Sequence, residues 1–230
     1  MDIRTIQLKK TILENNDKDA DLLREQLRKE GTFYINVMSS PGSGKTTMLT
    51  NTIRLLQRID GALRIGVMEA DIDGDVDAQT IHRETGVPAV QLHTGGMCHL
   101  DADMSRQGLR EIGSSALDIV FLENVGNLVC PAEFDTGAEI DVVILSVPEG
   151  DDKPLKYPLM FEEADVVLVT KTDAAPAFDF NEKKFEKNLR TCNHTAPVFF
   201  ISARTGDGMD KWCEWLQRCI TEFHRSAGSA

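Results

Sequence analysis

Long apolar runs are missing from this sequence of 230 residues. No segment approaches the roughly 18 uninterrupted apolar residues that a membrane-spanning helix requires, so we expect no membrane span. Residues 1–27 alternate charged side chains with single apolar ones and lack the apolar core of a secretory signal. These two absences predict a cytoplasmic protein.

Cysteine is scarce, and basic residues are outnumbered. Five cysteines, an odd number, are too few for a disulfide framework, which leaves reduced thiols for metal binding or burial. The 37 acidic side chains exceed the 25 basic ones, for a formal net charge of -12. Even the most basic cluster, Lys183, Lys184 and Lys187, alternates with Glu182 and Glu186. Such a chain repels nucleic-acid backbones, so we expect no nucleic-acid partner.

The chain shows no internal repeat and no linker rich in Pro, Gly or Ser, and its length fits one domain. After Gly31, seven short runs of β-branched or aromatic residues appear, with helical segments between many of them. The expected strands are 33–38, 63–68, 89–92, 118–122, 141–147, 165–169 and 197–201, and the expected helices are 46–58, 77–85, 102–112, 181–190 and 208–224. This alternation predicts an α/β fold of three layers, with helices on both faces of a mainly parallel seven-stranded sheet.

The two ends of the chain lie outside this alternation. Apolar residues at helical spacing over 3–30, interrupted around residues 15–17, predict an N-terminal helical arm that packs on the domain or on a partner. We therefore divide the chain into an arm (1–30), one domain (31–225) and a flexible tail (226–230).

A phosphate-binding motif follows the first expected strand. The string SSPGSGKTT, which begins at Ser39, matches the pattern G-x-x-x-x-G-K-[ST] except that Ser39 replaces the first glycine. Gly42 and Gly44 let backbone N–H groups turn towards a polyphosphate at the start of the next helix. We expect Lys45 to neutralise phosphate oxygens and Thr46 to hold Mg²⁺, as in P-loop NTPases, whereas the alternative is an ordinary turn. The expected phosphate-binding residues are Ser40, Gly42, Ser43, Gly44, Lys45, Thr46 and Thr47.

Carboxylates follow the second expected strand. Ligands gather beyond the carboxyl ends of parallel strands, so we expect Asp71 to bind Mg²⁺ or to position water. Asp77 is a further candidate for Mg²⁺, or else it caps the next helix. Asp73 and Asp75 fit a solvated acidic loop better than a ligand set.

The fourth expected strand, 118–122, is followed by Glu123, Asn124, Val125 and Gly126. We expect the Glu123 carboxylate to bind Mg²⁺ or water, and the Gly126 backbone N–H to contact the γ-phosphate. The residues predicted to carry out hydrolysis are Lys45, Asp71 and Glu123. Turnover is expected to be slow, because no arginine finger is evident in the chain.

Two later strand ends resemble the guanine-reading segments of GTPases. Residues 170–173 (TKTD) resemble N-K-x-D, in which the Asp accepts hydrogen bonds from guanine groups that adenine lacks. Thr170 replaces the usual Asn, which normally braces the loop. Residues 202–204 (SAR) resemble the S-A-K segment that supports guanine, so we expect GTP rather than ATP; the alternative is an exposed turn. The expected base-binding residues are Thr170, Lys171, Asp173, Ser202, Ala203 and Arg204.

Two segments carry candidate ligands for a softer metal. Cys98 and His99 follow a Gly-Gly pair that lets both side chains reach one ion, and Cys130 lies seven residues beyond Glu123. Thiolates and an imidazole suit Zn²⁺ or Ni²⁺, and three ligands leave a position open for transfer. The alternative is a buried thiol beside a surface histidine. We adopt that alternative for Cys192, Cys213, Cys219, His82, His93, His194 and His224.

Five strings together resemble the HypB family, the GTPases that assist nickel insertion into [NiFe]-hydrogenases: MSSPGSGKTT, GGMCHLD, ENVGNLVCP, EGDDKPLKYP and SARTGDG. The resemblance spans residues 31–222. It implies a GTPase of the SIMIBI class that dimerises with nucleotide and holds metal through Cys98, His99 and Cys130 at the dimer face. It also implies two partners, HypA and the hydrogenase large subunit precursor, and suggests that Lys153 contacts the dimer or its nucleotide.

Some members of that family carry an N-terminal Cys-rich nickel site or a His-rich tract. No Cys or His precedes His82 here, so we expect neither high-affinity N-terminal nickel binding nor nickel storage.

The sequence thus predicts a GTP-hydrolysing metallochaperone that uses GTP or GDP, Mg²⁺, and Ni²⁺ or Zn²⁺. Glu123, Gly126 and Cys130 share one short segment, so loss of the γ-phosphate is expected to displace a thiolate ligand. The alternatives are a related GTPase that serves urease or a cobalamin enzyme, a regulatory module with a structural nucleotide, and a small-molecule kinase. A kinase would need an Arg-rich lid, which the segment after Lys171 does not contain.

Overall fold

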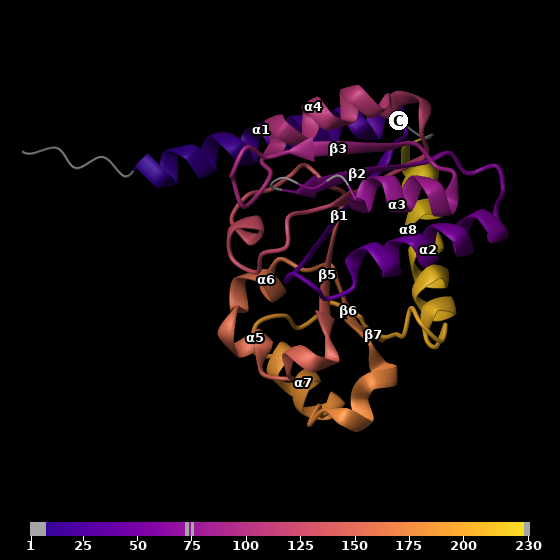
Figure 1. Cartoon of the computed structure of the whole chain (residues 1–230). Helices are drawn as coiled ribbons and strands as arrows, with labels where there is room; N and C mark the ends of the chain where they lie inside the picture. Colours follow the sequence, from indigo (N-terminus) through magenta and orange to yellow (C-terminus); the bar gives the residue numbers. More distant parts are fainter. Residues whose placement is uncertain (1–7, 72–73, 75, 228–230) are drawn as a thin grey trace, which may run out of the picture.

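A seven-stranded, fully parallel sheet forms the centre of the computed structural model, which describes residues 8–71, 74 and 76–227 (Figure 1). Its strands are β1 (Phe33–Ser39), β2 (Ile65–Asp71), β3 (Ala89–His93), β4 (Ile119–Glu123), β5 (Ile140–Ser146), β6 (Val166–Thr170) and β7 (Val198–Phe200). They pair in the order β3-β2-β4-β1-β5-β6-β7. The seven predicted strands and the parallel sheet are therefore confirmed, with boundaries shifted by one to three residues.

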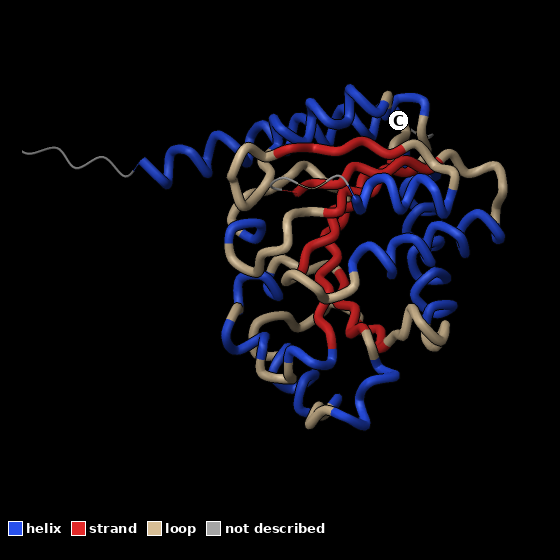
Figure 2. The backbone as a smooth tube through the Cα atoms, viewed as in Figure 1, coloured by secondary structure: helices blue, strands red, loops and turns tan. Residues whose placement is uncertain are grey.

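Helices cover both faces of the sheet, as Figure 2 shows. They are α1 (Leu8–Glu30), α2 (Lys45–Ile59), α3 (Val76–Thr85), α4 (Ala102–Ile112), α5 (Lys153–Lys156), α6 (Pro158–Glu162), α7 (Glu182–Leu189) and α8 (Met209–Ala227). Apolar side chains of α2, α3 and α8 pack on one face, and those of α1, α4, α6 and α7 pack on the other. The three-layer arrangement is thus confirmed. Among the described residues, none of the helices has the length and apolar character that crossing a bilayer would need.

Strand β1 shows why the sheet is buried on both sides. Its side chains alternate, so that Ile35 and Val37 face the α2 layer, while Tyr34 packs in the α1 layer. All seven of its residues are buried. A central parallel strand of this kind has a nearly continuous apolar sequence, which explains why the strand could be predicted.

Helix α1 is more regular than its sequence suggested. The predicted interruption around residues 15–17 is wrong, because the helix runs without a break from Leu8 to Glu30. Asn16 is buried, and its side chain donates to the Asp135 carbonyl (2.9 Å) and accepts from the Ala102 N–H (2.9 Å). These tertiary bonds occupy the amide that would otherwise compete with the helix backbone. The part of the predicted arm before Leu8 lies outside the described residues.

The other departures lie near the C-terminus and after β5. Helix α8 continues to Ala227, two residues into the segment predicted as a flexible tail, and residues 228–230 lie outside the described part of the chain. Two short helices, α5 and α6, fill the connection between β5 and β6, where none was predicted. Each has a proline in its first turn, and neither is long enough to show a helical period in the sequence.

Candidate functional site

The P-loop, residues 39–47, connects β1 to α2 at the carboxyl edge of the sheet, as predicted for a P-loop NTPase. Gly42 (φ 73°) and Gly44 (φ 95°) both adopt the left-handed conformation that favours glycine. Gly44 stands immediately before the first residue of α2, so the loop delivers its N–H groups to the positive end of a helix.

Ser39, the departure from the motif, is the centre of the hydrogen bonds inside the P-loop. Its buried hydroxyl accepts from Ser43 Oγ (2.6 Å) and from Lys45 Nζ (3.1 Å), and donates to the Ser40 carbonyl (2.8 Å). Ser40 in turn donates to the Glu149 carboxylate. The serine that replaces the usual glycine therefore holds Lys45, the lysine predicted to bind phosphate, close to the loop.

Thr46 and Glu123, predicted to share a magnesium ion, lie in contact. Thr46 Oγ1 donates to Glu123 Oε1 at 2.8 Å. Burial raises the pKa of Glu123 to about 7, although nearby Lys45 favours the charged carboxylate. Glu123 Oε2 is buried and finds no hydrogen-bond partner among the described residues. A hydroxyl beside an unsatisfied carboxylate oxygen fits a hard cation such as Mg²⁺.

Asp71 and Asp77 both lie near enough to Glu123 for their charges to raise its pKa further. Asp71 ends β2, and its Oδ1 accepts from the Gly74 N–H at 3.2 Å. Asp77 lies inside the first turn of α3, so it is not the residue that caps this helix. The structure therefore gathers the three predicted carboxylates, while Asp73 and Asp75 lie outside the described residues.

One buried carboxyl beside this group was not predicted. Glu69 pairs in register with Glu123 on the neighbouring strand and is 3% exposed. Burial raises the pKa of Glu69 to about 8, and the charge of Glu123 adds to the effect. Glu69 lies two residues before Asp71 on β2, and no local pattern indicated that its side chain would be buried.

The two segments predicted to read the base meet at one pocket of about 270 Å³. Thr170 Oγ1 donates to the Ser43 carbonyl of the P-loop at 2.7 Å, so Thr170 braces the loop although it replaces Asn. Lys171 has a left-handed backbone (φ 60°) although it is not a glycine, and it donates from Nζ to the Gly42 carbonyl at 2.6 Å. The lining residues are Ser43, Gly44, Thr47, Thr170, Lys171, Asp173, Ala174, Ala203 and Arg204.

Asp173 is held at this pocket by the second segment. Its Oδ1 accepts from Ser202 Oγ at 2.7 Å, and its Oδ2 lies 3.7 Å from the exposed guanidinium of Arg204. Asn51 on α2, which was not predicted, donates from Nδ2 to the Ala203 carbonyl at 2.6 Å. Asn51 and Ala203 are 152 residues apart, so no local pattern could have linked them.

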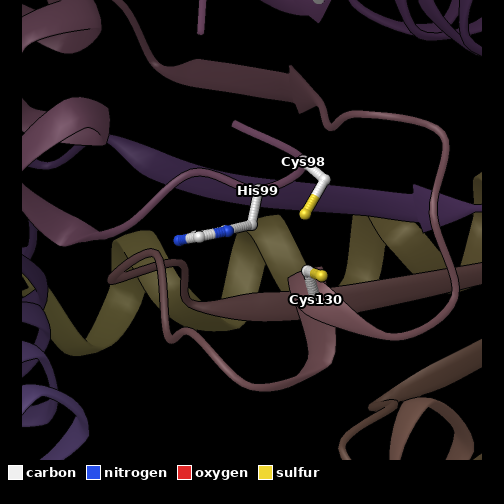
Figure 3. Close-up of side chains that lie close together, drawn as sticks. All are labelled: Cys98, His99 and Cys130. Carbon is white, nitrogen blue, oxygen red and sulfur yellow. The ribbon is translucent and has the colours of Figure 1, made fainter. Parts of the chain in front are cut away.

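The metal triad consists of Cys98, His99 and Cys130, whose ligand atoms all lie within 4.8 Å of one another. Figure 3 shows the two sulfur atoms facing the same small space, with the imidazole to one side. Gly95 (φ 63°) and Gly96 (φ 93°) turn the chain before Cys98, as the Gly-Gly pair predicted. Three such atoms at this spacing fit a borderline cation such as Zn²⁺ or Ni²⁺.

His99 is oriented by a ring that the sequence did not indicate. Phe134 stacks on the imidazole with the ring centroids 3.8 Å apart and the planes 14° apart. Burial lowers the pKa of His99, which favours the neutral form that binds metals. Its Nδ1 is buried without a hydrogen-bond partner in the described part of the chain, so this atom is available as a ligand.

Cys130 connects the triad to the nucleotide region. It begins a 3-10 turn, η2 (Cys130–Ala132), and the neighbouring Cys98 raises the pKa of its thiol. We call residues 124–129 the β4–η2 loop. A Cβ on Gly126 of this loop would lie 3.1 Å from Pro41 Cα, so the loop packs closely on the P-loop.

The remaining predicted positions are less informative. Lys153 begins α5, and its Nζ lies 5.1 Å from the ring centroid of Tyr157 in the same chain, so its contact with a dimer stays a prediction. Cys213 is buried, and Cys192 and Cys219 are half-buried.

Comparison with known proteins agrees with this geometry. The family described as "CobW/HypB/UreG, nucleotide-binding domain" matches residues 33–200. The hydrogenase maturation factor HypB of Azotobacter chroococcum is 46% identical over 215 residues, which cover 94% of this chain and 69% of that protein. The hydrogenase/urease maturation factor HypB of Helicobacter pylori is 37% identical, with 98% and 93% covered. A crystal structure of Helicobacter pylori HypB in complex with nickel is similar, with a TM-score of 0.83, 38% identity, and 91% and 97% covered.

Proposed function

The chain belongs to the HypB branch of the CobW/HypB/UreG family, and we propose that it is a GTP-hydrolysing metallochaperone for nickel. The observation that carries this proposal is the link between two sites. Glu123 lies at the phosphate site, and the segment that follows it packs on the P-loop at Gly126 and reaches the metal triad at Cys130.

The P-loop binds the phosphates of GTP through its N–H groups and Lys45. When GTP enters, we propose that Lys45 leaves the Ser39 hydroxyl, 3.1 Å away, for phosphate oxygens, which accept charge-assisted bonds. Ser40, Ser43 and Thr47 complete the cradle. Asp173 and Lys171 read the base, with Thr170, Ser202, Ala203 and Arg204 supporting them.

Glu123 is proposed to orient the attacking water. Thr46 and Glu123, with Asp71 or Asp77, would hold Mg²⁺, which neutralises developing phosphate charge when it is bound. Removal of the Glu123 proton, whose pKa is about 7, makes its carboxylate an acceptor for that water near neutral pH. Turnover is proposed to be slow, in the absence of an arginine finger.

The metal triad is proposed to carry Ni²⁺ as cargo, and Zn²⁺ as a competitor for the same thiolates. Loss of the γ-phosphate frees Gly126 to move relative to Pro41, and Cys130 moves with it. A coupling of about 1 to 3 kcal/mol between two such sites would change metal affinity roughly 5- to 150-fold.

The recipient and the assembly follow from the family. We propose a cytoplasmic protein that forms a homodimer dependent on nucleotide and metal, with Lys153 at the dimer or nucleotide contact. A HypA-like chaperone would exchange nickel with it, and the hydrogenase large subunit precursor would receive the metal. Delivery to urease is the second candidate, favoured by the name of the Helicobacter pylori relative.

A titration of the reduced, metal-free protein tests this function. Ni²⁺ and Zn²⁺ are added in GDP and in a non-hydrolysable GTP analogue, while molar mass is followed by light scattering and phosphate release is assayed with GTP. We expect hydrolysis of GTP, and metal affinity and mass that both depend on the nucleotide. Retained nucleotide without turnover would instead indicate a regulatory module, and an unresponsive metal site would remove the coupling.

A further inference from the structure

A chain of buried hydrogen bonds runs from the β4–η2 loop across two strands. The Val125 N–H donates to Asn124 Oδ1 at 2.8 Å, and Asn124 Nδ2 donates to Asn36 Oδ1 at 3.0 Å. Asn36 on β1 then donates from Nδ2 to Asp141 Oδ1 on β5, at 2.7 Å. Both asparagines are 1% exposed, so the bonds between them are shielded from water.

The far end of this chain lies at the wall of a large acidic cavity. The cavity has a volume of about 690 Å³ and lies between α1, the segment after Cys130, and residues around the start of β6. Asp141 and Asn36 are cross-strand partners, which explains why their side chains meet at this wall. The charged residues that line the cavity are Asp17, Arg24, Glu133, Asp135, Asp141, Glu163 and Asp165.

The two ends of this series of hydrogen bonds determine which group donates and which accepts in each bond. A backbone N–H can only donate, so the Val125 amide fixes which end of the Asn124 side chain faces it, and the amide of Asn36 follows. An ionised Asp141 can only accept, and it ends the chain with a charge-assisted bond. Protonation makes this acceptor neutral and gives it a proton to donate, which weakens the bond that orients Asn36.

We propose that Asn36 and Asn124 are positioning residues for the β4–η2 loop, and that the ionisation of Asp141 sets how firmly they hold it. The consequence for GTP hydrolysis and metal binding rests on the function proposed above. The loop is well placed to transmit such a change, because Gly126 packs on Pro41 of the P-loop and Cys130 follows at the end of the loop.

The surroundings of Asp141 place its change of charge near neutral pH. Burial raises its pKa to about 7, and the carboxylates of Asp165 and Asp135 add to this effect. Arg24, from α1, opposes it, and Asn36 stabilises the charged form by donating to it. The other charged groups that face the cavity are Asp17 on α1, Glu133 after η2 and Glu163 after α6. The buried phenol of Tyr34, on β1, also lies near Asp141.

Amide hydrogen exchange, measured by NMR on the whole chain at pH 8 and pH 6, tests the proposal. After correction for intrinsic rates, we expect the protection of the Val125 amide to fall about fivefold at the lower pH, the change that one ordinary hydrogen bond represents. Asp141→Asn, which is neutral at both pH values, is expected to remove this dependence. Asn36→Leu interrupts the chain of hydrogen bonds and leaves Asp141 in place, so we expect low protection of the Val125 amide at both pH values.

Glu163→Gln is the matched control, because it neutralises a carboxyl of the same cavity outside the hydrogen-bonded chain. It is expected to keep the parent dependence on pH. The proposal is overturned by a parent protein whose Val125 protection does not change, by an Asp141→Asn variant that keeps the change, or by a Glu163→Gln variant that loses it. Absent GTP turnover in the parent would overturn the proposed GTPase function, and the exchange result would still decide this inference.

Discussion

The P-loop and the metal triad differ in what holds their functional side chains. In the P-loop, the polar groups bind one another: Ser39 accepts from Ser43 and Lys45, and Thr170 braces the loop from β6. The site is therefore organised before any nucleotide arrives. Such preorganisation reduces the ordering that binding would otherwise require.

The metal triad is held by packing and backbone turns instead. Phe134 stacks on His99, left-handed glycines lead to Cys98, and a 3-10 turn presents Cys130. The buried Nδ1 of His99 has no hydrogen-bond partner among the described residues, which agrees with the metal-binding role proposed for this group. We therefore expect the P-loop to be the fixed element, and the affinity of the triad for metal to follow the position of the loops that carry it.

Removal of the P-loop lysine is the largest expected effect. Lys45→Ala deletes the charge that faces the phosphates, and we expect kcat for GTP to fall about 100-fold or more, by analogy with loss of one preorganised transition-state donor. The nucleotide effect on metal affinity disappears with it. Phosphate release assays check this, with Lys187→Ala on the exposed side of α7 as the control. Hydrolysis at the parent rate would show that Lys45 is not the phosphate lysine.

Removal of one thiol separates the two regions. Cys130→Ser replaces a soft ligand by a hydroxyl, and we expect Ni²⁺ and Zn²⁺ affinity to fall at least about 10- to 100-fold, the range seen when even an outer partner of a metal ligand is lost. GTP affinity stays near the parent value, because the P-loop bonds do not involve Cys130. Metal titration checks this, with Cys192→Ser as the matched control. Unchanged metal stoichiometry in Cys130→Ser would remove the triad from the mechanism.

The carboxylate at the phosphate site is expected to cost stability at high pH. The pKa of Glu123 is about 7 in the folded protein and its ordinary value is 4.5, so the folded state binds the proton more tightly. Stability linked to this group is therefore greatest at low pH and falls as the pH rises from about 4.5 through 7, by at most about 3 kcal/mol. For the nucleotide-free protein, Glu123→Gln is expected to raise the melting temperature at pH 8 and to change it little at pH 5.

Thermal unfolding at the two pH values measures this effect, with Glu186→Gln on the exposed side of α7 as the control. A Glu123→Gln variant with a lower melting temperature than the parent at pH 8 would show that the carboxylate stabilises the nucleotide-free protein. Burial also raises the pKa values of Glu69 and Asp141, but both variants retain these carboxyls, so their contribution to the pH dependence is shared with the parent.

The sheet and the site were predictable to different extents for a physical reason. Buried parallel strands are apolar along their length, and a P-loop needs Gly42, Gly44 and Lys45 at fixed local spacing, so both leave a local signal. Cys98 and Cys130 could be grouped because one follows a Gly-Gly pair beside His99, the other lies on the segment after Glu123, and both segments resemble those of the HypB family. In the structure their contact joins the loops that follow β3 and β4, two strands separated in the sheet by β2.

Residues whose role depends on distant contacts left no such signal. Phe134 reaches His99 from 35 residues away, and Asn51 supports Ala203 across most of the chain. The prediction at Asn16 was wrong for the same reason. Asparagine usually disfavours helix interiors, but here its side chain forms hydrogen bonds with a loop and with the start of α4. Local patterns therefore identified the chemistry, whereas tertiary packing decided which side chains orient it.

The smallest expected effect tests whether the P-loop depends on its brace. Thr170→Val keeps the shape of a side chain that is 3% exposed and removes the hydroxyl that donates to the Ser43 carbonyl at 2.7 Å. Loss of one such bond predicts about a fivefold weaker affinity for GDP, measured by fluorescence titration. Thr170→Ser keeps the hydroxyl and is expected to bind GDP like the parent. Equal affinity in the valine and serine variants would mean that the Thr170 hydroxyl does not organise the loop, and that the bonds of Ser39 and the bond from Lys171 to the Gly42 carbonyl hold its shape.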